Sequence, residues 1–240
     1  MTWSDRLSLF TPWDYAAVAL LFLAWIGIGL LIENAGKRGS VSNLTTEYRI
    51  AWMEQMVTRD PRIFDSQILG ILRQGTAFFA SACMIAIGGM LALIGNAERL
   101  AGVAQDLTLE TAPIFVWEFK LLLVILLVVN GFLKFVWSHR LFGYCAVLMA
   151  AVPNDPADPA AYPRARKAAA LNVTAARSYN RGLRSIYFAM AATAWLLGAV
   201  PLIVAVLFTL AVVYRREFAS QSREALLADE GQDPQTPEIR

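Results

Sequence analysis

The stretch that decides the fold is IFVWEFKLLLVILLVVNGFLKFV, residues 114–136. About 20 apolar residues in a helix are enough to cross the hydrocarbon core of a bilayer. Three further stretches of this kind occupy residues 13–32, 76–94 and 186–214. The whole chain is 57% hydrophobic and only 17% charged. We therefore expect an all-α, polytopic membrane protein with four transmembrane helices.

The first apolar stretch begins with a helix-start signal. Thr11 can cap the helix, Pro12 suits its first position, and Asp14 can reach back as the acid of a capping box. Residues 1–10 carry little positive charge, and no clear small-residue cleavage site follows the stretch. We expect Asp14 to be structural and the first span to remain in the mature protein.

The basic residues of the connections predict an orientation. Residues 33–75 and 138–185 contain six and seven Lys and Arg residues, whereas residues 95–113 contain one. Cytoplasmic connections carry an excess of Lys and Arg. We expect the first and third connections in the cytoplasm and the N-terminus outside. Four crossings would leave the C-terminus outside too, which conflicts with Arg215 and Arg216 directly after the last apolar stretch.

The segment around Pro201 allows two interpretations. Proline removes a backbone donor and kinks a helix, so residues 186–214 are predicted to form one kinked span. The alternative is a hairpin, whose two arms of about 14 residues fall short of a full crossing. Acids and prolines follow in residues 221–240, which we expect to be a disordered tail. Residues 1–220 then form a single membrane domain.

The two basic connections have helical patterns of their own, over about residues 44–74 and 141–184. No proline interrupts residues 114–152, which as one helix would reach close to 60 Å, about twice the hydrocarbon thickness. Its distal, again apolar part needs cover, and the connection helices can supply it as a helical cytoplasmic cap. The competing possibilities are a break at Gly143 and helices lying on the lipid headgroups.

Several short motifs, spread over residues 13–220, match a known family. They are Arg59-Asp60-Pro61-Arg62-Ile63, Ala77-Phe78-Phe79-Ala80-Ser81, Lys134-Phe135-Val136-Trp137-Ser138-His139-Arg140, Arg181-Gly182-Leu183-Arg184 with Tyr187-Phe188, and Tyr214-Arg215-Arg216-Glu217-Phe218. Through them the chain resembles the domain of unknown function 599 family of bacterial and plant membrane proteins. Gly143-Tyr144 departs from the Asn-Tyr pair expected in that family. The resemblance implies a four-span protein of the bacterial inner membrane and supplies no activity.

Polar residues inside the third span are one candidate site. The span carries Glu118, Lys120, Asn130 and Lys134. The two lysines lie 14 residues apart and share a helix face, with Asn130 one turn from Lys134. They can snorkel to opposite interfaces, while Glu118 suits the helix N-terminus. Alternatively they form a membrane polar stripe that lines an oligomeric pore or meets a partner's acid.

A basic stripe is the second candidate. No acid lies between Asp158 and Glu217, whereas six cations lie in residues 164–184. Arg177, Arg181 and Arg184 follow at helical spacing just before the fourth span. They can bind anionic lipid or another anionic ligand. Alternatively they reflect positive-inside topology and pair with acids of the first connection, namely Glu47, Glu54, Asp60 or Asp65.

Catalytic and cofactor motifs are missing from the sequence. It has no phosphate-binding loop and no nucleophile elbow. His139 is the single histidine, and Cys83 and Cys145 lack metal-ligand spacing. We expect no enzyme and no cofactor or metal, but a membrane scaffold or accessory subunit, either oligomeric or bound to another membrane protein. The alternative is an oligomeric channel or transporter for an ion or small anionic solute. A net charge of only +2 argues against nucleic acid as a partner.

Overall fold

The computed structural model describes residues 6–35, 39–96, 102 and 113–228. The predictions for Lys37, Arg38, Arg99 and the tail from residue 229 on lie outside these residues. Helices make up the regular structure of the described part, which confirms the all-α prediction. They are α2 Pro12–Glu33, α3 Val41–Gln55, η2 Met56–Thr58, α4 Ile63–Ile94, α6 Ile114–Ala150, α7 Ala161–Thr193, η3 Ala194–Leu197, α8 Ala199–Phe218 and α9 Gln221–Leu227.

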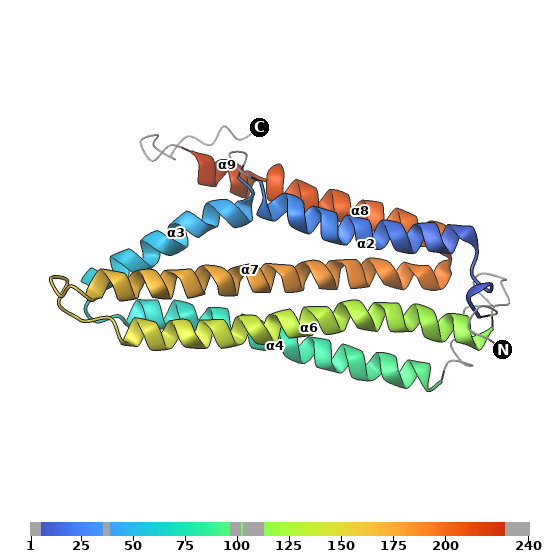
Figure 1. Cartoon of the computed structure of the whole chain (residues 1–240), viewed down its shortest axis with the longest axis horizontal. Coiled ribbons are helices and arrows are strands. Elements are labelled where there is room, and N and C mark those ends of the chain that lie inside the picture. Colours follow the sequence, from blue (N-terminus) through green and yellow to red (C-terminus); the bar gives the residue numbers. More distant parts are fainter. Residues whose placement is uncertain (1–5, 36–38, 97–101, 103–112, 229–240) are drawn as a thin grey trace.

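The helices form an elongated bundle (Figure 1). The long helix α7 runs along its length, with α6 and then α4 on one side and the pair of α2 and α8 on the other. One half contains α2 and α8 together with parts of α4, α6 and α7, and we call it the apolar half. The other, the distal half, contains α3, the first part of α4 and the joined ends of α6 and α7.

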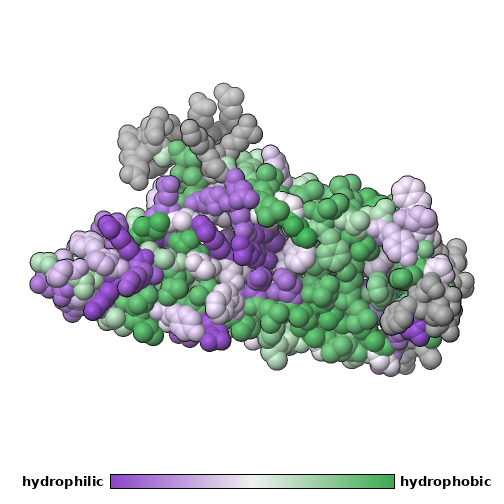
Figure 2. Space-filling model, viewed as in Figure 1, coloured by the Kyte–Doolittle hydropathy of each residue, from purple (hydrophilic) through white to green (hydrophobic). Residues whose placement is uncertain are grey.

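Four helices are long and apolar enough to cross a membrane: Pro12–Glu33, Ile63–Ile94, Ile114–Ala150 and Ala199–Leu227. This confirms the prediction of a polytopic helical membrane protein. Apolar side chains cover the surface of the apolar half, whereas the distal half is mixed with polar residues (Figure 2). On α4, for example, Ile85 is 77% exposed. Such a surface is stable against lipid and costly in water.

The predicted helix start at Thr11 is confirmed. The Thr11 hydroxyl accepts from the backbone N–H of Asp14, and the Asp14 carboxylate accepts from the backbone N–H of Thr11 at 2.9 Å. The same carboxylate accepts a hydrogen bond from Trp195 Nε1 at 2.7 Å. Asp14 is therefore structural, and it ties the start of α2 to the segment between α7 and α8.

The third span continues into the distal half without a break. Helix α6 passes through Gly143, so the alternative of a break there is wrong. Phe142, Cys145 and Met149 are buried on its distal part, against Met53 of α3 and the alanine-rich start of α7. This second core confirms that the connection helices cover the distal end of α6, as their pattern predicted.

The prediction of one kinked span over residues 186–214 is wrong. Helix α7 ends at η3, and Gly198 has φ +118° and ψ 175°, a conformation that L side chains rarely adopt. Pro201 lies in the first turn of α8, where no backbone donor is needed. Helix α8 then returns alongside α7, since Arg216 Nη1 donates to the hydroxyl of Tyr187 at 2.8 Å.

The end of the described chain also differs from the prediction. Gln221–Leu227 form the short helix α9, capped by Ser220, so the expected disordered tail is wrong for these residues. The Arg223 guanidinium donates to the carbonyl of Gly39 at 3.1 Å. The chain beyond α8 therefore lies beside the start of α3, at the same level as the end of α2.

Candidate functional site

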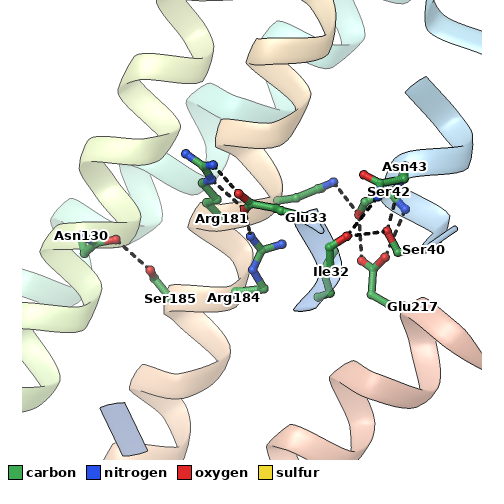
Figure 3. A network of polar contacts seen from close by, with 11 residues as sticks. Ile32, Glu33, Ser40, Ser42, Asn43, Asn130, Arg181, Arg184, Ser185 and Glu217 are labelled. Carbon is green, nitrogen blue, oxygen red and sulfur yellow. Dashed lines mark hydrogen bonds and ion pairs between the residues drawn. The ribbon is translucent and has the colours of Figure 1, made fainter. Parts of the chain in front are cut away.

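Polar side chains gather where the apolar half meets the distal half (Figures 2 and 3). Five helices contribute to this set, which we call the polar layer. Its members are Glu33 of α2, Ser42 of α3, Asn130 and Lys134 of α6, Asn180, Arg181, Arg184 and Ser185 of α7, and Glu217 of α8. The layer lies at the boundary that separates lipid-like from water-like surface.

Glu33 holds two arginines of α7 (Figure 3). Arg181 donates hydrogen bonds to both carboxylate oxygens, and its Nε lies 2.8 Å from Oε1. Arg184 Nη2 donates to the same Oε1 at 2.8 Å, and its side chain is only 8% exposed. Gly29, one turn before Glu33, leaves room for the Arg184 guanidinium. A charged group desolvated to this degree needs a close counter-charge, which Glu33 supplies.

Glu217 joins the ends of two helices on another side of α7. Its carboxylate accepts from the backbone N–H of Ser42 at 3.1 Å and from the Ser42 hydroxyl at 2.9 Å. Asn180 donates to that hydroxyl at 3.2 Å. A carboxylate at the first turn of a helix is favourable because the backbone N–H groups there lack partners. The end of α8 is thereby fixed to α3.

A lateral cavity of about 310 Å³ opens on the polar layer. We call it the boundary cavity. One wall is apolar and comes from α2, and the other is polar and comes from α6 and α7. Its lining residues are Trp25, Ile26, Gly29, Leu30, Glu33, Asn130, Lys134, Arg181, Arg184 and Ser185. Three of these are cations and one is an acid, so the cavity is positive.

Lys134 supplies one of the two positive charges that Glu33 does not balance. It is half-buried, and within the described part of the chain it forms no ion pair. Its neighbour Asn130 accepts a hydrogen bond from the Ser185 hydroxyl at 3.0 Å. The boundary cavity therefore combines an uncompensated ammonium group, a shared arginine pair and an apolar wall, a set that can bind an anion with an apolar body.

The residues of the predicted membrane polar stripe do not form one site in the structure. Asn130 and Lys134 lie together in the boundary cavity, as their spacing predicted. Lys120 lies about 21 Å further along α6. There its ammonium group is 5.1 Å from the ring centroid of Trp117 and 5.7 Å from that of Trp195. Lys120 is 6% exposed and so does not snorkel to the surface.

The three arginines of the predicted basic stripe do not form one site either. Arg181 and Arg184 line the boundary cavity, whereas Arg177 is exposed and does not. The sequence pattern suggested Glu47, Glu54, Asp60 or Asp65 as partners, and Glu33 was not among them. The available signal was the position of Glu33 at the C-terminal end of an apolar helix, where an acid opposes the helix dipole and needs a cation. One of the proposed acids, Glu54, does pair with α7, at 3.1 Å from Arg166 Nε.

The remaining predicted residues have other surroundings. Glu118 is half-buried near the start of α6. His139 contacts the hydroxyl of Thr76 at 3.1 Å and the guanidinium of Arg73 at 3.4 Å. The two cysteines are buried and unpaired. Among the described residues, no three His, Cys, Asp or Glu side chains gather as metal ligands do.

Comparison with known proteins identifies a family and no relative of known role. The family described as "Protein of unknown function, DUF599" matches residues 16–222, which include α3, α4, α6, α7 and α8 and all of α2 except its first four residues. No curated protein and no solved structure matches the chain. The match covers most of the sequence and bears out the resemblance of its short motifs. The chain belongs to the DUF599 family of proteins of unknown function.

Proposed function

We propose that this protein is a non-catalytic scaffold or accessory subunit of the bacterial inner membrane, and that the boundary cavity binds the phosphate of an anionic lipid. The observation that carries the proposal is the excess positive charge of that cavity beside an apolar wall. A phospholipid matches both features, because its phosphate can meet Lys134 while its acyl chains lie along Ile26 and Leu30. Both of these side chains are exposed on α2.

The proposed placement puts the polar layer at the cytoplasmic surface and the distal half in the cytoplasm as a cap. The basic connections support this, because α3, the first part of α4 and the joined ends of α6 and α7 all lie at the distal side of the layer. The second half of α7 is not one of the four helices that are apolar enough to face lipid, but in this placement it makes a fifth crossing inside the bundle, and α8 returns the chain to the cytoplasmic side. Arg215 and Arg216 lie on that side in this arrangement, which removes the conflict that four crossings created.

Aromatic residues support the same placement. Trp13 and Tyr15 are exposed at the N-terminal end of α2, and Trp137 and Tyr214 are exposed near the polar layer. Trp and Tyr are enriched at the two surfaces of a bilayer. The N-terminus would then be outside. Since anionic lipids concentrate in the cytoplasmic leaflet, the boundary cavity would face the leaflet that supplies its ligand.

A channel or transporter for a small anion is the alternative. The open, positive boundary cavity favours it, because an anionic solute could enter there. The closed surroundings of Lys120 weigh against it, because two tryptophans cover that lysine and Asp14 lies close enough to interact with its charge. A path along α6 would have to pass this cluster. Flux of chloride or phosphate into liposomes containing the purified protein would favour the alternative.

Native mass spectrometry of the purified protein tests the lipid proposal. Lys134→Met removes one of the two unbalanced charges of the cavity and leaves the Glu33 pairs intact. A single cation near an anionic surface contributes about 1 kcal/mol, so the affinity for phosphatidylglycerol should fall about fivefold. Arg177→Gln is the matched control, because it removes one charge from α7 outside the cavity. Equal retention of phosphatidylglycerol in Lys134→Met and the wild type would contradict the proposal.

A further inference from the structure

A second cavity, of about 350 Å³, lies in the distal half between α4 and α6, away from the polar layer. We call it the distal cavity. It is lined by Met56, Arg62, Ser66, Leu69, Gly70, Arg73, Ala146, Met149, Ala150 and Asn154. Two of these residues are arginines, and none is an acid. The floor between them consists of apolar side chains from both helices. The volume is within the range of small-molecule sites.

The guanidinium of Arg62 donates its hydrogen bonds to neutral carbonyl groups. Its Nη1 donates to the carbonyl of Val152 at 2.7 Å, and its Nη2 donates to the carbonyl of Pro153 at 2.7 Å. Its buried Nε has no hydrogen-bond partner in the described part of the structure. These carbonyls fix the guanidinium in place at the end of the cavity without neutralising it. A fixed, desolvated and uncompensated cation attracts an anion strongly.

Arg73 lies three turns further along α4 and also lacks an acid. Its guanidinium contacts His139 Nε2 at 3.4 Å. The carboxylate on the same helix, that of Asp65, lies outside the cavity lining: its Oδ1 accepts from Arg59 at 2.5 Å and from Trp52 Nε1 at 2.7 Å, and its buried Oδ2 has no partner in the described part of the structure. Neither Arg62 nor Arg73 belongs to an ion pair within residues 39–96 or 113–228. The distal cavity is thus bordered by two positive charges and floored by apolar side chains.

We infer that the distal cavity is a binding site for a soluble organic anion with an apolar body, such as a short-chain carboxylate. The anionic group would bind a guanidinium, and the apolar body would cover Leu69 and Met149. The distal half carries mixed polar surface rather than the apolar surface that faces lipid (Figure 2), which favours a ligand from the aqueous phase over a membrane lipid. The inference does not depend on lipid binding at the boundary cavity.

Isothermal titration calorimetry of the full chain in mild detergent, with hexanoate as the probe, tests this site. Gly70→Leu is the blocking variant, because Gly70 lines the cavity and a Cβ atom added there meets nothing within 4 Å. It should abolish hexanoate binding. Gly75→Leu is the matched control: it adds the same side chain to the same helix, also with nothing within 4 Å, but outside the cavity. It should bind hexanoate as the wild type does.

Arg73→Gln removes one positive charge from the border of the distal cavity and leaves the hydrogen bonds of Arg62 in place. It should weaken hexanoate binding roughly tenfold, as expected for the loss of a hydrogen bond to a charged group. Hexanoate binding that is absent in the wild type, or unchanged in Gly70→Leu, would overturn the inference. If inorganic phosphate binds as tightly as hexanoate, the inference that the ligand has an apolar body would be wrong. A phospholipid that native mass spectrometry finds in the wild type and not in Gly70→Leu would replace the soluble ligand by a lipid.

Discussion

Lys120 and Lys134 lie on the same face of α6, yet their surroundings are opposite. Lys120 is almost fully buried between the rings of Trp117 and Trp195, close to the Asp14 carboxylate. Lys134 is half-buried and lines an open cavity, where it adds to the charge of Arg181 and Arg184. Two lysines that the sequence places in one stripe therefore have different consequences. The first fixes helices to each other, and the second leaves a charge available to a ligand.

The largest expected effect is at Lys120. Lys120→Met removes the buried cation from the faces of its two tryptophan rings. A desolvated cation over aromatic rings contributes about 2 kcal/mol or more, so the unfolding free energy should fall by at least that amount. Lys134→Met is the matched variant at the open site and should cost less than about 1 kcal/mol. Unfolding in mixed detergent micelles measures both, and equal losses would contradict the comparison.

The next effect concerns the packing next to the boundary cavity. A Cβ atom at Gly182 of α7 would lie 2.8 Å from the Phe135 ring, which is fully buried. Gly182→Leu should therefore lower the unfolding free energy by about 2 kcal/mol through overpacking. Gly143→Leu, on the distal part of α6 with nothing within 4 Å of its Cβ, should be nearly neutral. An unfolding free energy of Gly182→Leu equal to that of the wild type would mean that the helices beside the boundary cavity are loosely packed.

A smaller effect is expected at the turn that brings Trp195 to Lys120. Gly198 has φ +118°, so Gly198→Ala forces a strained backbone and should cost about 1 kcal/mol. Gly88→Ala in the last third of α4 adds a Cβ atom that meets nothing within 4 Å, and it serves as the control. The control should raise helix stability slightly. The same melting temperature for Gly198→Ala and the wild type would show that the hairpin does not depend on this conformation.

The smallest effect is expected at Arg177. It is exposed and lies outside the boundary cavity, so Arg177→Gln should change the unfolding free energy by less than about 0.5 kcal/mol. Arg184→Gln removes a nearly buried partner of Glu33 and should lower it by at least about 1 kcal/mol. Thermal melts of the two variants, compared side by side, check this difference. Equal melting temperatures would indicate that Arg177 and Arg184 belong to one stripe after all.

The helices and the second core could be predicted because they follow from local pattern. The capping box at Thr11 is complete within four residues, and the apolar repeat of α6 continues past Gly143. Helices with such repeats need a packing partner, and the connections were the available ones. The short motifs also identified the family correctly.

The candidate site could be predicted only in part, because its contacts join distant parts of the chain. Glu33 and Arg181 are 148 residues apart, and no local rule pairs them. The turn before α8 was missed for a different reason. Pro201 carries the conspicuous signal, but a proline in the first turn of a helix is harmless. Gly198, three residues earlier, makes the turn through a backbone conformation that its sequence context does not specify.

The side of the membrane on which each segment lies tests the account most directly. Cysteines introduced at Asn96, Pro159 and Ala228 can be labelled with an impermeant maleimide in spheroplasts, because the native Cys83 and Cys145 are buried. We predict labelling of residue 96 from outside, and labelling of residues 159 and 228 only after permeabilisation. Labelling of residue 228 from outside, with residue 159 protected, would contradict the fifth crossing. Labelling of residue 159 from outside would contradict the cytoplasmic cap and the leaflet that the lipid site requires.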